Sequence, residues 1–287
     1  MSLLTFDLGG TSLRAAIYSN EGEELAYWKK QTSDFQSAQD AFKEAIASFA
    51  QHKLSKCAIG APDIDVKSGQ VRAHNLPWPH FNVKVILKGL IGIEPLCYND
   101  ADLQALALAR ELGPSASALV FTLGTGVGMG IVSAGKLFEG VMGVEGGHLY
   151  VGGERECLCG VQGHLEAYVG GAAILKRAKE LGFEAPSIGP LADLARAGNA
   201  ELYALFEEVG TKLGIGIASA VSTLGIGNVI ISGGVAGSSD LFFDRSKTTA
   251  LKYIFPLFRD QLHLSIGDLP SDHVGLWGAY CALSSHS

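Results

Sequence analysis

The feature that most constrains the fold is a pattern of strand, glycine-rich turn and strand that occurs twice. The first copy spans residues 3–18 around the turn Gly9-Gly10-Thr11, and the second spans residues 118–132 around the turn Gly124-Thr125-Gly126. In both copies the residues on either side of the turn are largely apolar, which is typical of buried strands joined by a tight connection. The sequence therefore predicts two separate pairs of buried strands.

Both turns suit phosphate oxygens. Glycine lets backbone N–H groups come close to a phosphate, and Thr11 and Thr125 add hydroxyl donors. Either turn alone could be an ordinary hairpin connection. Two such turns, each bounded by apolar strands, favour phosphate binding. Neither is a Walker loop, because no Gly-Lys-Ser/Thr follows, and neither is a dinucleotide fingerprint, because a strand and not a helix follows the turn.

A third glycine pair, Gly233-Gly234, follows an apolar strand near residues 230–231, which in turn follows an expected long helix at 200–224. The pair could line a nucleotide pocket or simply form the turn before a helix, and the two interpretations are compatible.

A short glycine-containing segment combines zinc-type ligands with carboxylates. It holds two thiols, two imidazoles and two carboxylates: Glu145, His148, Cys157, Cys159, His164 and Glu166. Thiolate and imidazole are the usual ligands of structural zinc, and carboxylates accept hydrogen bonds from hydroxyl groups. The alternative is that the cysteines are small core residues, since a Cys-x-Cys spacing alone is a weak zinc signal.

Two acidic residues lie at the ends of expected strands. Asn99-Asp100 joins a strand near residues 96–98 to a helix expected over 101–112, and Asp7 ends the first strand. An Asp at a helix N-terminus is commonly only a cap, and an Asp beside Gly-Gly can be only a turn residue. Spacing alone favours the cap for Asp100.

Composition narrows the class of protein. The 287 residues fit about two domains, and 47% hydrophobic content indicates a well-cored globular chain. The net charge of −7 and pI near 5.6 argue against a nucleic-acid partner. No signal peptide is expected, and the apolar run 213–226 is too short to cross a membrane. The three other cysteines, Cys57, Cys97 and Cys281, are expected to be buried thiols of a cytoplasmic protein.

The string Glu-x-Gly-His followed by Cys-x-Cys-Gly-x-x-Gly resembles the signature of the ROK family, a group of bacterial sugar kinases and sugar-responsive repressors. The resemblance extends from Asp7 to about Ala279. It implies an α/β, two-lobed actin-like (ribonuclease H-like) sugar kinase fold with a central cleft. We expect a small lobe of residues 1–113 plus 274–287 and a large lobe of residues 114–273 that carries the zinc loop.

The resemblance also implies an ATP-dependent hexose kinase and roles for individual residues. Asp100 would be the catalytic base. The sugar would be bound by Asn99, Asp100, Glu145, His148 and Glu166. Mg-ATP would be bound by Asp7, Gly9, Gly10, Thr11, Gly124, Thr125, Gly126, Gly233 and Gly234. In the family one His and three Cys hold a structural zinc. Here the third Cys is His164, so the expected set is His148, Cys157, Cys159 and His164.

Several alternatives stay open. Glucose is the leading substrate, but N-acetylmannosamine, N-acetylglucosamine and fructose kinases share the pattern, and a non-catalytic sugar sensor would keep the fold. A metal-binding structural module would explain the Cys/His cluster but not the glycine turns. A homodimer is expected from the family, with no membrane partner.

Two upstream segments depart from the family pattern. Residues 60–65 are one residue short and carry Asp63 near a usual glycine, while Asn75-Leu76-Pro77-Trp78 resembles a family segment. Neither is assigned to the sugar site.

Overall fold

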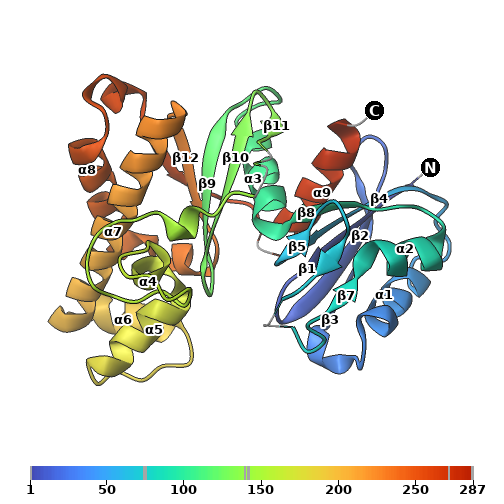
Figure 1. Ribbon diagram of the computed structural model, residues 1–287, viewed down its shortest axis with the longest axis horizontal. Helices are drawn as coiled ribbons and strands as arrows, with labels where there is room; N and C mark the ends of the chain where they lie inside the picture. Colours follow the sequence, from blue (N-terminus) through green and yellow to red (C-terminus); the bar gives the residue numbers. More distant parts are fainter. Residues whose placement is uncertain (1, 74–75, 139, 141–142, 271, 286–287) are drawn as a thin grey trace. The chain divides into compact units, whose positions relative to one another are not determined.

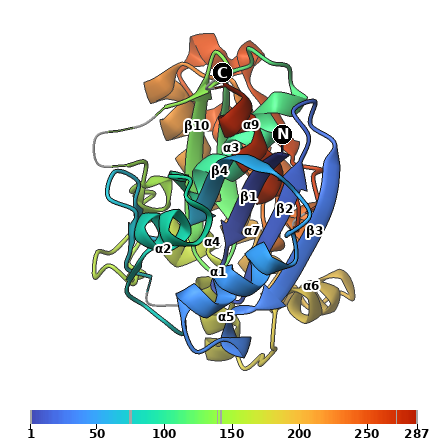
Figure 2. The ribbon, with the colours of Figure 1, turned by 90° about the vertical axis from the view of Figure 1, so that its right-hand side faces the viewer.

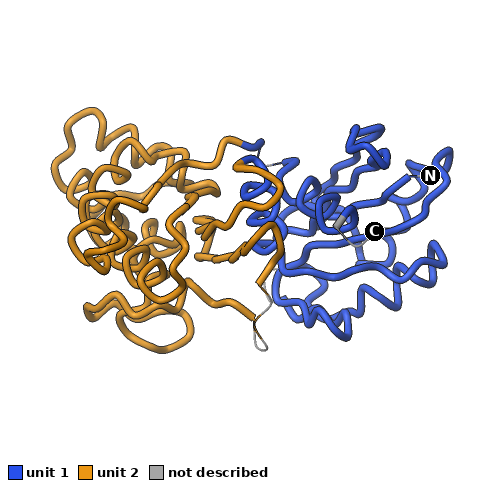
Figure 3. Tube along the Cα trace, turned by 90° about the horizontal axis from the view of Figure 1, so that it is seen from above, with its two compact units in different colours: residues 1–111, 269–287 blue, residues 112–268 orange. Residues whose placement is uncertain are grey.

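The computed structural model describes residues 2–73, 76–138, 140, 143–270 and 272–285. The chain divides into two compact units, coloured separately in Figure 3. Unit 1 comprises residues 1–111 and 269–287, and unit 2 comprises residues 112–268. Asn75 of the upstream segment lies outside the described residues.

Unit 1 is built on a five-stranded sheet in the order β3-β2-β1-β4-β8. Its strands are β1 (Ser2–Leu8), β2 (Ser12–Tyr18), β3 (Glu24–Gln31), β4 (Leu54–Ala61) and β8 (Leu96–Asn99). Strands β1, β2 and β3 pair antiparallel, whereas β1, β4 and β8 pair parallel. The helices are α1 (Ala38–Ala47), α2 (Val83–Ile91), α3 (Asp100–Glu111) and α9 (Val274–Ser285), seen with the sheet in Figures 1 and 2.

Unit 2 repeats this sheet, with the order β11-β10-β9-β12-β13 and the same parallel and antiparallel pairings. Its strands are β9 (Ala118–Leu123), β10 (Val127–Ser133), β11 (Lys136–Leu137), β12 (Asn228–Ser232) and β13 (His263–Ile266). The helices are α4 (Glu166–Val169), α5 (Gly171–Glu180), α6 (Ile188–Arg196), α7 (Ala200–Leu224) and α8 (Phe243–Tyr253). The two sheets share one topology, and each glycine turn joins the first two strands of its sheet.

Smaller elements complete the described chain. A three-stranded sheet in unit 1 consists of β5 (Ile64–Asp65), β6 (Gln70–Val71) and β7 (Phe81–Asn82). Short 3-10 helices lie at Thr32–Asp34, Gly146–His148, Gly234–Leu241 and Pro256–Gln261.

Alternation along β1 decides which side chains enter the core of unit 1. Leu4, Phe6 and Leu8 are fully buried and belong to the cluster that includes Phe42 of α1, with the Phe6 and Phe42 rings edge to face at 5.2 Å. Because successive side chains of a strand point to opposite faces, Asp7 faces the other way. There it lies against Gly275 of α9. The carboxyl group is therefore held by the sheet and the last helix.

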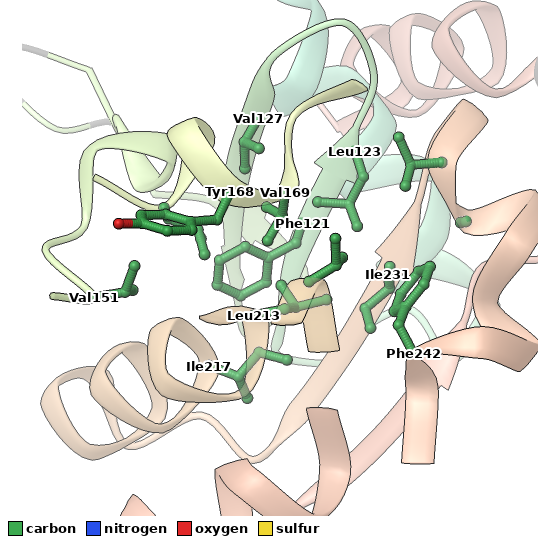
Figure 4. Packing of buried hydrophobic residues seen from close by; sticks show 14 of the residues in the cluster. Phe121, Leu123, Val127, Val151, Tyr168, Val169, Leu213, Ile217, Ile231 and Phe242 are labelled. Atoms are coloured by element: carbon green, nitrogen blue, oxygen red, sulfur yellow. The ribbon is translucent and has the colours of Figure 1, made fainter. Parts of the chain in front are cut away.

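The core of unit 2 forms between its sheet and α7. Phe121 and Leu123 of β9 point toward Leu213 and Ile217 of α7, as Figure 4 shows, and all four are fully buried. Helix α7 begins with Asn199 as its N-cap and ends at Gly225, whose φ of 69° is readily adopted only by glycine. This rigid layer supports the second glycine turn.

The strands expected on both sides of each glycine turn and the helix expected at 200–224 are confirmed. The helix after Asn99 is also confirmed and begins at Asp100. Cys57, Cys97 and Cys281 are buried, as expected. Among the described helices, none combines the length and apolar character needed to cross a bilayer.

Candidate active site and metal cluster

The first glycine turn is fixed by its own backbone and by Thr32. The N–H of Gly9 donates to the carbonyl of Ser12 at 2.9 Å, which closes the hairpin between β1 and β2. The Thr32 hydroxyl donates to the carbonyl of Gly10 at 3.0 Å, and its backbone N–H donates to the carbonyl of Thr11 at 3.0 Å. The carbonyls of Gly10 and Thr11 are thus occupied by protein donors, and Thr11 is exposed.

Asp7 is buried beside this turn and has a cationic partner. Arg14 Nη1 lies 3.1 Å from Asp7 Oδ2, and the two residues are directly opposite in the β1–β2 register. A Cβ atom on Gly275 would come within 2.7 Å of the Asp7 carboxyl carbon, so only glycine lets α9 pack this close. Burial raises the pKa of Asp7, and the Arg14 charge acts in the opposite direction.

Asp100 lies at the carboxyl edge of the parallel strands of unit 1. Ala61 of β4 and Asn99 of β8 are register partners, so the residues after both strands meet at one edge. Burial raises the pKa of Asp100 to about 6, and the nearby charges of Asp7 and Asp63 act in the same direction. A carboxylate that titrates near neutrality suits a general base.

Asp100 also lies where it can cap helix α3, but Asn99 can cap the same helix. The N–H of Ala101 lies 2.9 Å from both Asn99 Oδ1 and Asp100 Oδ1. Since the Asn99 amide oxygen can accept this N–H, helix capping does not by itself require a carboxylate at Asp100.

The second glycine turn is held by the start of α5. Within the turn, the Gly124 N–H donates to the carbonyl of Gly126 at 3.0 Å. The N–H groups of Gly171 and Ala172 donate to the carbonyls of Gly124 and Thr125 at 2.8 and 3.0 Å. Gly124 and Thr125 themselves are exposed. As in the first turn, the carbonyl oxygens are tied back to protein.

The two outer glycines of this turn differ in what surrounds them. A Cβ atom on Gly126 would collide with the Glu166 carboxylate, whereas one on Gly124 would meet no atom within 4 Å. Glu166 Oε2 accepts a hydrogen bond from the N–H of Val127 at 2.9 Å. The sequence accounted for Gly126 only by the close approach of its backbone to phosphate. In the structure, its contact with the Glu166 carboxylate also requires glycine at this position.

The predicted zinc ligands converge at one point in unit 2. His148 Nδ1 lies 3.8 Å from Cys157 Sγ, and His164 Nδ1 lies 3.2 Å from Cys159 Sγ. One ligand atom from each of the four residues can be chosen so that all lie within 4.8 Å of one another. In a tetrahedral zinc site the ligand atoms lie roughly 3.3–3.8 Å apart, given zinc bonds of about 2.0–2.3 Å. Small movements of these side chains would give that geometry, so the residues fit zinc.

Backbone hydrogen bonds shape the loop that carries the cluster. The N–H of Cys157 donates to the carbonyl of Val161 at 3.0 Å, and the N–H of Gly160 returns to the carbonyl of Cys157 at 2.8 Å. Gly160 and Gly163 have φ angles of 85° and 80°, which glycine adopts without strain. Cys157 is buried and Cys159 exposed, so the cluster lies at the protein surface.

The carboxylates near the cluster have different environments. Glu145 has a side chain that is 73% exposed, and its Oε2 lies 4.0 Å from His148 Nε2. Glu166 instead faces the glycine turn with one oxygen and the Cys157 thiol, at 3.7 Å, with the other. Glu145 is therefore open to a ligand, while Glu166 also has a role inside the protein.

The third glycine pair lies at the end of β12, next to β9 in the sheet. Gly233 has a φ of 95°, and a Cβ atom there would lie 2.5 Å from the carbonyl oxygen of Leu123. Gly234 has open space where a Cβ atom would be. Because Leu123 immediately precedes Gly124, the pair lies beside the second glycine turn.

Within each unit the structure brings the predicted residues together. Unit 1 holds Asp7, the turn at residues 9–11, Asn99 and Asp100, while the other predicted site residues belong to unit 2. Sequence reasoning missed Arg14 and Thr32. No local signal marks Thr32, and Arg14 could have been found only by its position opposite Asp7 across the hairpin.

A second group missed from sequence supports the metal loop. Two cations approach the ring of Tyr168, with Lys212 Nζ at 4.4 Å and the Arg155 guanidinium at 4.9 Å from its centroid. Lys212 also donates to the carbonyl of Gly152 at 2.6 Å, and Arg155 pairs with Glu208 of α7. These contacts attach the loop before the cysteines to α7.

Comparison with known proteins identifies the family of the chain. The family model described as the ROK family matches residues 3–284. A glucokinase of Halalkalibacterium halodurans is 28% identical over 297 residues, covering 93% of this chain and 90% of the relative. An N-acetylmannosamine kinase of Escherichia coli is 32% identical over 252 residues, covering 84% of this chain and 85% of the relative.

A solved structure shares the fold along the whole chain. The crystal structure of a ROK family glucokinase from Streptomyces griseus, in complex with glucose and AMPPNP, superimposes with a TM-score of 0.76. It is 27% identical, and the match covers 100% of both chains. The repeated sheet topology of the two units is that of the actin-like ATPase fold of ROK sugar kinases. The chain belongs to the ROK family.

Proposed function

We propose that this protein is an ATP-dependent kinase of a hexose. The observation that carries the proposal is Asp100, a carboxyl group whose pKa is raised to about 6 at the carboxyl edge of the unit 1 sheet. Such a group can take the proton of a sugar hydroxyl as the hydroxyl attacks a phosphoryl group. Relatives named as sugar kinases, one of them solved with glucose and AMPPNP, support the assignment.

The glycine turns are proposed to receive the nucleotide. Thr32 holds the carbonyls of Gly10 and Thr11, and the first residues of α5 hold those of Gly124 and Thr125, so both turns are fixed in place before a ligand arrives. Asp7 would orient hydrated Mg²⁺ beside the phosphates, and Gly233-Gly234 would approach the adenosine. When bound, Mg²⁺ offsets the charge of the phosphates.

The sugar is proposed to contact Asn99, Asp100, Glu145, His148 and Glu166. Glucose is the leading substrate, because a glucokinase relative matches over most of the chain and one is solved with glucose. N-acetylmannosamine is supported by the relative at 32% identity. N-acetylglucosamine and fructose stay within the proposed class.

The Cys/His cluster is proposed to hold one structural zinc through His148, Cys157, Cys159 and His164. When bound, zinc supplies a fixed tetrahedral junction for the loop and no chemistry on the sugar. Glu145 approaches His148, and Glu166 contacts Cys157, so the cluster can position both carboxylates.

A non-catalytic sugar sensor is the alternative from another class. Two observations argue against it: both glycine turns are formed, and Asp7 and Asp100 of unit 1 lie close enough for their charges to interact. We also propose that the protein acts in the cytoplasm as a homodimer, a state that light scattering of the purified protein would test.

The deciding experiment measures ADP release with Mg-ATP against glucose, fructose, N-acetylmannosamine and N-acetylglucosamine. We expect one sugar to support turnover, and Asp100→Asn to abolish it while calorimetry still detects sugar binding. Sugar binding without ADP release from any of the four would instead identify a sensor.

A further inference from the structure

Arg14 links the proposed magnesium-orienting carboxylate to a residue near the other end of the chain. Its Nη1 lies 3.1 Å from Asp7 Oδ2, and its Nε donates to Asp272 Oδ1 at 3.0 Å. Asp272 lies just before α9, 258 positions away in sequence. The guanidinium is therefore held at two points, which fixes its plane.

The second anchor is itself held by another strand. Lys29 Nζ of β3 lies 2.6 Å from Asp272 Oδ2. Lys29, Asp272, Arg14 and Asp7 form a chain of alternating charges that runs from the surface to the buried carboxylate. The side chains of the outer pair are more exposed, at 35% for Lys29 and 40% for Asp272, than those of the inner pair, at 18% for Arg14 and 8% for Asp7. Water and salt screen the pair of Arg14 and Asp7 less, so the energy of this pair depends more strongly on its geometry.

The guanidinium also lies against the first glycine turn. A Cβ atom built on Gly9 would be 3.8 Å from Arg14 Nη1. Among the described residues, only Oδ2 of the Asp7 carboxylate is engaged in a hydrogen bond or ion pair, which leaves Oδ1 for a metal-bound water. Arg14 thus fixes the rotamer of Asp7 and places a positive charge beside backbone that is proposed to face phosphate.

We propose that Arg14 is a nucleotide-positioning residue, held by Asp272, that orients Asp7 and the Gly9-Gly10-Thr11 turn for the triphosphate of Mg-ATP. This inference rests on the proposed kinase function. A triphosphate entering beside the buried carboxylate of Asp7 and the partly buried carboxylate of Asp100 meets like charge. A fixed cation next to the turn reduces that repulsion without having to move when the nucleotide binds.

A purely structural ion pair is the competing explanation, since Arg14 also ties β2 to the segment before α9. The two explanations differ in what changes when Arg14 is replaced. Loss of a structural ion pair lowers the thermal midpoint of the protein and leaves the ratio of the KM for Mg-ATP to the KM for the sugar unchanged. Loss of a nucleotide-positioning residue raises the KM for Mg-ATP and leaves the KM for the sugar near its original value.

The test compares Arg14→Ala, Arg14→Lys and Asp272→Asn with the control Lys30→Ala. Lys30 lies on β3 next to Lys29 in sequence, and its ion pair with Glu44, at 2.7 Å, is separate from the Arg14 chain. For each variant we would measure both KM values, kcat, the thermal midpoint and, by calorimetry without sugar, the affinity for Mg-ATP.

We expect Arg14→Ala to raise the KM and Kd for Mg-ATP roughly 10- to 100-fold, the range for losing hydrogen bonds to charged groups. Arg14→Lys and Asp272→Asn should fall between Arg14→Ala and the wild type, and Lys30→Ala should match the wild type. An unchanged Kd for Mg-ATP in folded Arg14→Ala, or in Arg14→Lys if the alanine variant does not fold, would overturn the inference. Calorimetry separates this from failure of the proposed function, because Mg-ATP affinity is measurable even if no sugar supports turnover.

Discussion

Glu166 accepts a hydrogen bond from the backbone N–H of Val127, with 2.9 Å between Oε2 and the nitrogen. Its other oxygen is 3.7 Å from the thiol of Cys157. One side chain therefore joins the Cys/His cluster to the strand that leaves the second glycine turn. A disturbance of the metal loop can reach the turn through this carboxylate.

Substitutions at the two outer glycines of this turn should have different effects. Gly126→Ala places a methyl group against the Glu166 carboxylate, so we expect a lower thermal midpoint and weaker binding of both sugar and Mg-ATP. Gly124→Ala meets no protein atom within 4 Å, so the fold should be kept while the KM for Mg-ATP rises. Thermal melts and two-substrate kinetics check the pair. If the KM for Mg-ATP is unaltered in Gly124→Ala, the backbone of Gly124 does not approach phosphate closely.

Asp100→Asn should abolish turnover and stabilise the fold. Loss of a general base typically lowers kcat by about 10²–10⁴-fold. The folded-state pKa of Asp100, raised to about 6, means that the folded protein disfavours the ionised carboxyl. The neutral amide removes this cost, so above the folded pKa the variant should gain about 1–3 kcal/mol in unfolding free energy.

Urea unfolding at about pH 7.5 and about pH 4.5 checks the sign of this effect. The gain should be present at the higher pH, where wild-type Asp100 is charged, and should shrink at the lower pH, where it is protonated in the folded state. A variant less stable than the wild type at both pH values would show that the carboxylate is needed as a cap.

The pH dependence of catalysis should follow the same group. A general base must be ionised, so kcat/KM for the sugar should fall as the pH drops below about 6. Asp63→Asn removes a neighbouring negative charge that helps to raise the pKa of Asp100, so the acid limb should move to lower pH. Asparagine tolerates the positive φ of 47° at this position. An acid limb that stays in place in Asp63→Asn would mean that another group controls it.

Zinc content should depend on His164. We expect about one zinc per chain in protein purified without chelators, from a complete four-ligand set. His164→Cys restores the ligand type found in the family and should keep the metal, whereas His164→Ala should lose most of it. Elemental analysis measures this directly. Wild-type protein with far less than one zinc and full activity would show that the cluster acts without metal.

Removal of the metal should reduce the order of the loop and the affinity for sugar more than the affinity for nucleotide. Glu145 and Glu166 both contact members of the cluster, so chelation should weaken sugar binding in calorimetry and increase hydrogen exchange over residues 148–166. The first glycine turn belongs to the other unit and should be protected as before. Equal loss of protection in both turns would indicate global unfolding in place of a local effect.

The sequence by itself determined the local structure. The strands beside each glycine turn, the helix at 200–224 and the helix after Asn99 are set by apolar periodicity, caps and turn residues, all of which act over a few positions. The Cys/His cluster was also predictable, because its four members lie between residues 148 and 164 and two of them share one tight loop. The family signature added chemistry to that pattern.

Only the tertiary structure decided the partners of the site residues. Asp272 reaches Arg14 across 258 positions because α9 returns to the first sheet, and Glu166 reaches Val127 across 39 positions because α4 packs beside β10. The sequence does not indicate such pairs, since any carboxylate of the chain could have been the partner of Arg14 or of the Val127 N–H. The raised pKa of Asp100 has the same origin: burial and the nearby charges of Asp7 and Asp63 come from three different strand ends that the folded sheet places at one edge.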